Sequence, residues 1–183
     1  MTDPFNGNAG CDDRIRASHR DHRVTTSRRS GRVVPRAFAA VALALCFSQP
    51  ARADCFDSAG TYQGVNPLVL RAIAWVESRG NPAAVHHNAN GSTDIGELQI
   101  NSVHLRELAT YGINAQGLRD ECVNIYVAAW HLKKQMVKYG NTWDAVGAYH
   151  SESPPLRDAY AQMVKTTLVR RGLMASSPLS PNQ

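Results

Sequence analysis

The chain of 183 residues lacks several features that mark common classes of protein. It has only four cysteines, no Cys-x-x-Cys pair and no spaced Cys/His cluster, which argues against a structural zinc site. The longest apolar run, AFAAVALALCF at 37–47, has 11 residues, whereas a membrane-spanning helix needs about 20. We therefore expect no metal site, no cofactor and no stable membrane anchor in the finished protein.

An excess of charge is also missing from most of the chain. The formal net charge is +5, and residues 1–53 account for all of it, with 9 Lys and Arg against 4 Asp and Glu. Residues 54–183 hold 11 of each kind. A balanced surface creates no field that attracts phosphate groups, so we do not expect nucleic acid as a partner.

The basic segment has the parts of an export signal. Four arginines come before the apolar run 37–47, and Ala51 and Ala53 follow it in the small-x-small arrangement that signal peptidase reads. We predict that residues 1–53 are a leader with a cleavable signal peptide, and that the mature chain begins at Asp54. An N-terminal membrane anchor is the alternative, which the shortness of the run disfavours.

Two cysteines remain after the predicted cut, Cys55 and Cys122. Only one pairing is possible between them, so we expect one disulfide bond; the alternative is two buried free thiols.

The pattern of the remaining chain predicts a mostly helical α+β domain over residues 54–171, followed by a disordered tail at 172–183. An Asn-Pro pair predicts a helix that begins at Pro67 and runs to about Arg79. Further helices are expected at 102–110, 121–139, 142–149 and 154–171, with a small β-hairpin at 95–100. Inward-facing positions are expected at Val123, Tyr126, Val127, Trp130, Met136 and Val137, and at Leu156, Tyr160, Val164 and Leu168.

One carboxylate falls on an apolar helix face. Leu70, Ile73 and Glu77 are spaced so that all three lie on one side of the first helix. Apolar surroundings disfavour the charged form of a carboxyl group and raise its pKa. Glu77 is therefore either neutralised by a buried partner or kept protonated because a reaction uses its proton.

Three short segments together make the chain recognisable. They are Glu77-Ser78 at a helix end, GELQIN at 96–101 and GAYHS at 147–151. In this order, with Cys55 and Cys122 at the expected places, they resemble the soluble-type lytic transglycosylases. The resemblance covers about residues 54–170 and is closest to small periplasmic members that accompany type III and type IV secretion, conjugation and pilus machines. It implies a lysozyme-like single domain and a periplasmic location.

The resemblance also implies a reaction and a set of residues. Glu77 would be the sole catalytic carboxylate, which cleaves the β-1,4 bond between N-acetylmuramic acid and N-acetylglucosamine and leaves a 1,6-anhydro end. Gln99 would bind sugar, Tyr149 would donate to the catalytic carboxylate or to the acetamido group, and Ser78 would orient the leaving sugar or the glutamate. Asn101 would belong to the same substrate site, although it could simply cap the following turn.

Glu97 departs from the family pattern, which has an apolar residue at this position. We expect its side chain to point to solvent; alternatively it could raise the pKa of Glu77 or alter the groove. Asp94 and Glu97 are also the nearest candidates for a second acid, which would favour a lysozyme-type hydrolase. The histidines are expected in loops or at the surface: His86, His87, His104 and His150.

The expected partners follow from the same resemblance. They are the glycan strands of peptidoglycan and components of an envelope-spanning machine, and the protein itself is expected to be a monomer. A wall-binding component without catalytic activity is the alternative from a different class, but it would not need Glu77.

Overall fold

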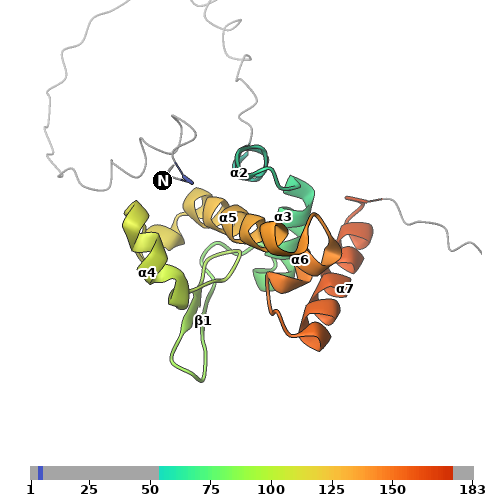
Figure 1. Cartoon of the computed structure of the whole chain (residues 1–183). Coiled ribbons are helices and arrows are strands. Elements are labelled where there is room, and N and C mark those ends of the chain that lie inside the picture. Colours follow the sequence, from blue (N-terminus) through green and yellow to red (C-terminus); the bar gives the residue numbers. More distant parts are fainter. Residues whose placement is uncertain (1–3, 6–53, 175–183) are drawn as a thin grey trace, which may run out of the picture.

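The computed structural model describes residues 4–5 and 54–174 (Figure 1). Apart from Pro4 and Phe5, the predicted leader lies outside the described residues, and so do residues 175–183 of the predicted tail. The helices are α2 (Cys55–Gln63), α3 (Pro67–Ser78), α4 (Leu105–Leu108), α5 (Glu121–Tyr139), α6 (Trp143–Ala148) and α7 (Pro154–Arg170). The described residues also contain three short 3-10 helices, η3 (Ser102–His104), η4 (Ala109–Tyr111) and η5 (Gly117–Arg119).

The long helix α5 organises the fold. Figure 1 shows it in the middle of the molecule, with α2 and α3 beside it, α4 near one end, and α6 and α7 near the other. Its residues 124–130 are all buried, and they form the centre of one hydrophobic core to which α2, α3 and α7 also contribute. Burial of this apolar surface is the main term that stabilises the domain.

Side-chain caps explain where the helices begin. Asn66 accepts a hydrogen bond from the backbone N–H of Leu68 at the start of α3, and Asp120 accepts one from Val123 at the start of α5. Both starts are as predicted. The helical segment after the sheet differs, because Asn101 and not Ser102 provides the cap, accepting from the N–H of Val103 at 3.0 Å.

The sheet is larger than the predicted hairpin. It has three antiparallel strands in the order β1 (Val85–His87), β2 (Thr93–Ile95) and β3 (Ile100–Asn101). Val85 pairs with Ile95, which in turn pairs with Ile100. The mostly helical α+β class is confirmed, but the first strand lies in a polar segment that the pattern of alternation did not reveal.

The turn between β2 and β3, residues 96–99, is fixed to α5 by one buried amide. Asn124 accepts from the N–H of Leu98 at 2.9 Å and donates to the carbonyl of Ile95 at 2.8 Å. Gly96 has a φ of 80°, and a Cβ at this position would overlap the side chain of Asn124. Only glycine allows the turn to approach α5 this closely.

Most of the predicted inward positions are confirmed, and two are wrong. Tyr126, Val127 and Trp130 of α5 are buried, and so are Tyr160, Val164 and Leu168 of α7. In contrast, Val137 is 77% exposed and Leu156 is 54% exposed. Both lie in the terminal turn of a helix, where fewer neighbouring elements cover the helix face.

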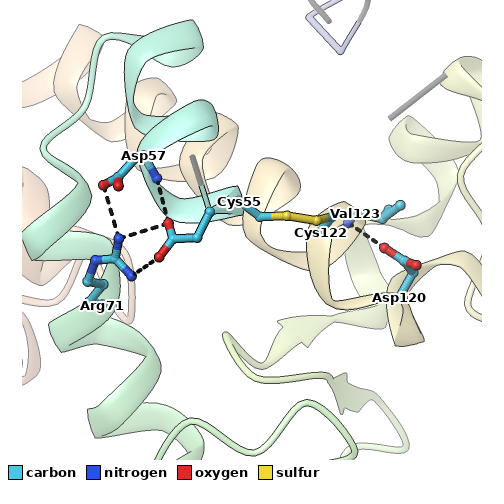
Figure 2. The surroundings of a disulfide bond; sticks show 7 residues. Cys55, Asp57, Arg71, Asp120, Cys122 and Val123 are labelled. Carbon is cyan, nitrogen blue, oxygen red and sulfur yellow. Dashed lines mark hydrogen bonds and ion pairs between the residues drawn. A yellow bond between two sulfur atoms is a disulfide. The ribbon is translucent and has the colours of Figure 1, made fainter. Parts of the chain in front are cut away.

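The predicted disulfide joins the beginnings of two helices, at Cys55 in α2 and Cys122 in α5 (Figure 2). Beside it, the side chain of Asp54 accepts from the N–H of Asp57 and forms an ion pair with Arg71 at 2.7 Å. Within the described residues, no helix is long and apolar enough to cross a membrane.

Candidate active site

A cavity of about 950 Å³ opens where the helices meet the sheet. Glu77 at the end of α3 lines it, together with Asp94 and Gln99 from the sheet and its turn. The opposite parts of its wall come from α5, through His131 and Gln135, and from residues 148–152 at and after the end of α6. The cavity therefore joins all three predicted motif segments, including the GAYHS segment.

Burial controls the protonation of Glu77. The side chain lies in the last turn of α3, and its desolvation by burial raises its pKa from 4.5 to about 7. A hydrogen bond from Tyr160 opposes the rise, because it stabilises the charged form, and the charge of Asp94 adds to it. At neutral pH, Glu77 can therefore both give and take a proton.

Tyr160 is the direct partner of Glu77. Tyr160 lies in α7, and its hydroxyl donates to Oε1 of the Glu77 carboxylate. Only 2% of Tyr160 is exposed. We predicted Tyr160 as an inward-facing residue but not as part of the site. The signal was present, because a buried tyrosine hydroxyl needs a partner and Glu77 is a carboxylate on a buried face.

Tyr149 contacts the second motif and not the carboxylate. In this structure the buried hydroxyl of Tyr149 donates to the carbonyl of Leu98 at 2.9 Å and not to Glu77. Burial raises the pKa of Tyr149 and keeps its proton in place. The residue lines the cavity and also holds the turn at 96–99 against the end of α6.

Gln99 and Ser78 both bind the backbone of the loops around the site. Nε2 of Gln99 donates to the carbonyl of Gly96 at 2.7 Å, and the residue lines the cavity. Ser78 does not line it: its hydroxyl donates to the carbonyl of Glu97 at 2.7 Å and accepts from the N–H of Asn81. Ser78 thus attaches the end of α3 to the turn.

Asp94 holds a cluster of amides on the cavity wall. It accepts hydrogen bonds from Asn101 at 2.6 Å and from Asn88 at 2.8 Å, one on each carboxylate oxygen. Asn101 also donates to Ser92 and caps η3. The capping alternative for Asn101 is therefore correct, although its side chain lies on the cavity wall as well.

Comparison with known proteins identifies the domain. The transglycosylase SLT domain matches residues 54–165. The chain belongs to this family. The predicted resemblance and the lysozyme-like fold class are thereby confirmed.

Three curated relatives are similar to this chain. The chain is 40% identical to invasion protein IagB of Salmonella typhimurium over 117 residues, which is 61% of this chain and 73% of IagB. It is 35% identical to protein IpgF of Shigella flexneri over 144 residues, covering 78% of this chain and 95% of IpgF. It is 44% identical to the X polypeptide of Escherichia coli over 99 residues, covering 54% and 59% respectively.

In this SLT domain Glu97 is buried, so the prediction that it points to solvent is wrong. Only 6% of the residue is exposed, because the turn is held on one side by Asn124 and on the other by Ser78. The pKa of Glu97 is raised to about 7, mainly by burial; the charge of Glu121 contributes to the rise and that of Arg71 opposes it. Glu97 does not line the cavity, which removes it as a candidate second acid.

His131 is a residue of the site that the sequence analysis missed. Its Nε2 lies 3.2 Å from the carbonyl of Tyr149, so this nitrogen carries the proton and Nδ1 is an acceptor. Nδ1 is buried without a hydrogen-bond partner in the described part of the chain. Burial and, to a smaller extent, the charge of nearby His104 together lower the pKa of His131 to about 4. His131 is therefore neutral at physiological pH.

Three histidines predicted in loops or at the surface also lie on the cavity wall: His86 of β1, His104 and His150. His104 is half-buried and its ring centre is 4.8 Å from that of His131. His150 is exposed, but its ring stacks on Tyr160 with 5.0 Å between the centres. Among residues 4–5 and 54–174, no group of three or more His, Cys, Asp or Glu side chains could hold a metal ion.

Proposed function

We propose that this SLT domain is a peptidoglycan lytic transglycosylase, which cleaves the β-1,4 bond between N-acetylmuramic acid and N-acetylglucosamine and leaves 1,6-anhydro ends. The observation that carries the proposal is Glu77, a carboxyl group with a pKa of about 7 on the wall of a 950 Å³ cavity. Membership of the transglycosylase family supports the same class of reaction.

The pKa of Glu77 suits a group that must act twice. Protonated Glu77 gives its proton to the glycosidic oxygen while the bond from that oxygen to C1 of the muramic acid residue breaks. The acetamido oxygen of the same sugar stabilises the positive charge at C1. The 6-hydroxyl then attacks C1 and returns a proton to the Glu77 carboxylate. A general acid–base group works best when its pKa lies near the working pH.

One neighbouring residue, Tyr160, and desolvation adjust this carboxyl group. Tyr160 donates to the carboxylate and stabilises it after the proton has left, while desolvation favours the return of the proton. Gln99 and Tyr149 line the cavity and are proposed to contact the glycan. Ser78 and Asn101 are proposed to act mainly through the loops that they hold.

A hydrolase is the second candidate, because Asp94 lines the same cavity and its charge acts on Glu77. Enzymes that hydrolyse glycosides commonly use two carboxylates on either side of the bond. Both oxygens of Asp94 already accept hydrogen bonds from amides, which fits a structural role better than activation of water.

Product analysis separates the two reactions. Digestion of purified peptidoglycan is expected to give muropeptides with 1,6-anhydro ends, which are one water lighter than hydrolysed ends in mass spectrometry. Glu77→Gln is expected to lower turnover by about 10⁴-fold or more, because general acid–base steps contribute about 10²–10⁴-fold and one residue serves both. Glu97→Gln is the matched control, since Glu97 is a buried carboxyl with a similar pKa outside the cavity.

Each result has a definite meaning for the proposal. Reducing ends from the wild type would support the hydrolase, with Asp94→Asn then expected to abolish activity. Equal turnover by wild type and Glu77→Gln would show that Glu77 is structural. Loss of activity in both Gln variants would show that the effect is not specific to Glu77.

We further propose that the protein acts in the periplasm as a monomer, after removal of residues 1–53. There it would open the wall locally for an envelope-spanning secretion, pilus or conjugation machine. The likeness to an invasion protein supports a role of this kind. Identification of the first residue of the exported protein tests the location, since any residue other than Asp54 would contradict the predicted cut.

A further inference from the structure

Pro4 and Phe5 pack against the SLT domain although residues 6–53 separate them from it. Gln63 donates from Nε2 to the carbonyl of Pro4 at 2.7 Å. The ring of Phe5 meets Tyr111 edge-on, with 5.2 Å between the ring centres, and lies 5.8 Å from Trp130. We call the surface formed by Gln63, Tyr111 and Trp130 the aromatic notch. Figure 1 shows the short blue segment near α2, α4 and α5.

The aromatic notch is built from three elements that the fold holds in fixed positions. Gln63 is the last residue of α2, Tyr111 is the last of η4, and Trp130 lies in the middle of α5. The disulfide ties α2 to α5, and the ring of Trp130 is part of the buried core. The notch is therefore a rigid surface, which lowers the cost of ordering on binding.

The contacts are those of short-peptide recognition. One hydrogen bond to a backbone carbonyl sets the position of the segment, and one aromatic side chain anchors it between two aromatic rings. Proline before the anchor restricts the free segment, so that less conformational entropy is lost when it binds.

The aromatic notch is separate from the catalytic cavity. Gln63, Tyr111 and Trp130 are all absent from the cavity wall, although Trp130 is next to His131 in α5. A segment bound in the notch therefore leaves the cavity open, and its role is docking rather than obstruction of the substrate.

We propose that the aromatic notch is a docking site for a Pro-Phe segment, and that Pro4–Phe5 of the same chain occupies it before the leader is removed. Docking within one chain is favoured by a high effective concentration, which is lost when the chain is cut. Cleavage after Ala53 would leave one hydrogen bond and one ring to hold a separate peptide. The notch is then vacated in the mature protein once the freed segment is diluted, whereas a large excess of added peptide still fills it.

Nuclear magnetic resonance of the full chain tests this docking. The chain has three tryptophans, Trp75, Trp130 and Trp143, each with one indole N–H signal that a Trp→Phe substitution assigns. Phe5→Ala is expected to shift the Trp130 signal by more than its line width, because the ring of Phe5 no longer lies beside it. The signals of Trp75 and Trp143 are the internal controls and are expected to stay in place.

A peptide completes the test. The peptide TDPFNG, which is residues 2–7 of the chain, is expected to return the Trp130 signal of the Phe5→Ala chain to its wild-type position in a saturable titration. The same peptide with alanine in place of phenylalanine is expected to have no effect. An unchanged Trp130 signal in Phe5→Ala would overturn the proposal, and so would failure of TDPFNG to restore it.

Discussion

At the scale of single residues, the pKa of Glu77 depends on its hydrogen bond from Tyr160. Desolvation raises the pKa of Glu77 to about 7 even though the Tyr160 hydrogen bond opposes the rise. Tyr160→Phe removes that hydrogen bond and keeps the ring in the core. Because hydrogen bonds to charged groups contribute about 1.5–3 kcal/mol, the pKa of Glu77 should rise by about one to two units.

The pH dependence of kcat/KM measures this change. The protonated form of Glu77 would persist to higher pH, so the alkaline limb of the profile should shift to higher pH in Tyr160→Phe. Tyr149→Phe is the control, because its hydroxyl binds the carbonyl of Leu98 and not Glu77. A profile that keeps its alkaline limb in Tyr160→Phe would show that the contact does not set the pKa.

Sequence periodicity predicted the burial of Glu77 because its neighbours on the helix face are local in the chain. It could not predict Tyr160 as the partner, since the two residues are 83 positions apart. The same limit explains the error at Glu97. Its burial depends on Asn124 and Ser78 holding the turn, and neither contact leaves a pattern in the GELQIN segment itself.

At the scale of elements, α3, α5, α6 and α7 were predictable because their caps and prolines are local signals, whereas α2 was not predicted. The sheet was not, since β1, β2 and β3 have only three, three and two residues. Such short strands show little alternation, and the turn that joins β2 to β3 is held by Asn124, a residue of α5.

The disulfide between α2 and α5 allows one experiment to test both the Cys55–Cys122 pairing and the removal of the leader. Cys55 is the residue after Asp54, so peptide mapping of exported protein without reduction should yield one linked peptide pair. One member should begin Asp54-Cys55 and the other should contain Cys122. Free thiols at both positions, or residues before Asp54 in the linked peptide, would contradict the prediction.

Removal of the disulfide by substitution tests its contribution to the stability of the fold. The disulfide closes a loop of 67 residues, which on the chain-entropy model stabilises the fold by about 4 kcal/mol. The Cys55→Ser, Cys122→Ser double variant should therefore unfold at lower temperature. It should keep its activity at 25 °C, because neither cysteine lines the cavity.

At the scale of the whole molecule, Glu97 couples stability to pH. Its pKa is raised from 4.5 in the unfolded chain to about 7 in the fold. Between these values the folded chain holds a proton that the unfolded chain has lost. Stability therefore falls as the pH rises through this window, and the loss is complete above pH 7.

Glu97→Gln removes this titration while keeping the size of the side chain. At pH 4.5 the variant should be close to the wild type in stability, because Glu97 is then protonated and neutral in the fold. At pH 8 it should be more stable by at most about 3 kcal/mol, which is the free energy of the pKa difference. Denaturation in urea at both pH values measures the difference. An equal difference at pH 4.5 and pH 8 would mean that the pKa of Glu97 is the same in the folded and the unfolded chain. A variant less stable at pH 8 would mean that the carboxylate is stabilised there, with Arg71 prevailing over burial.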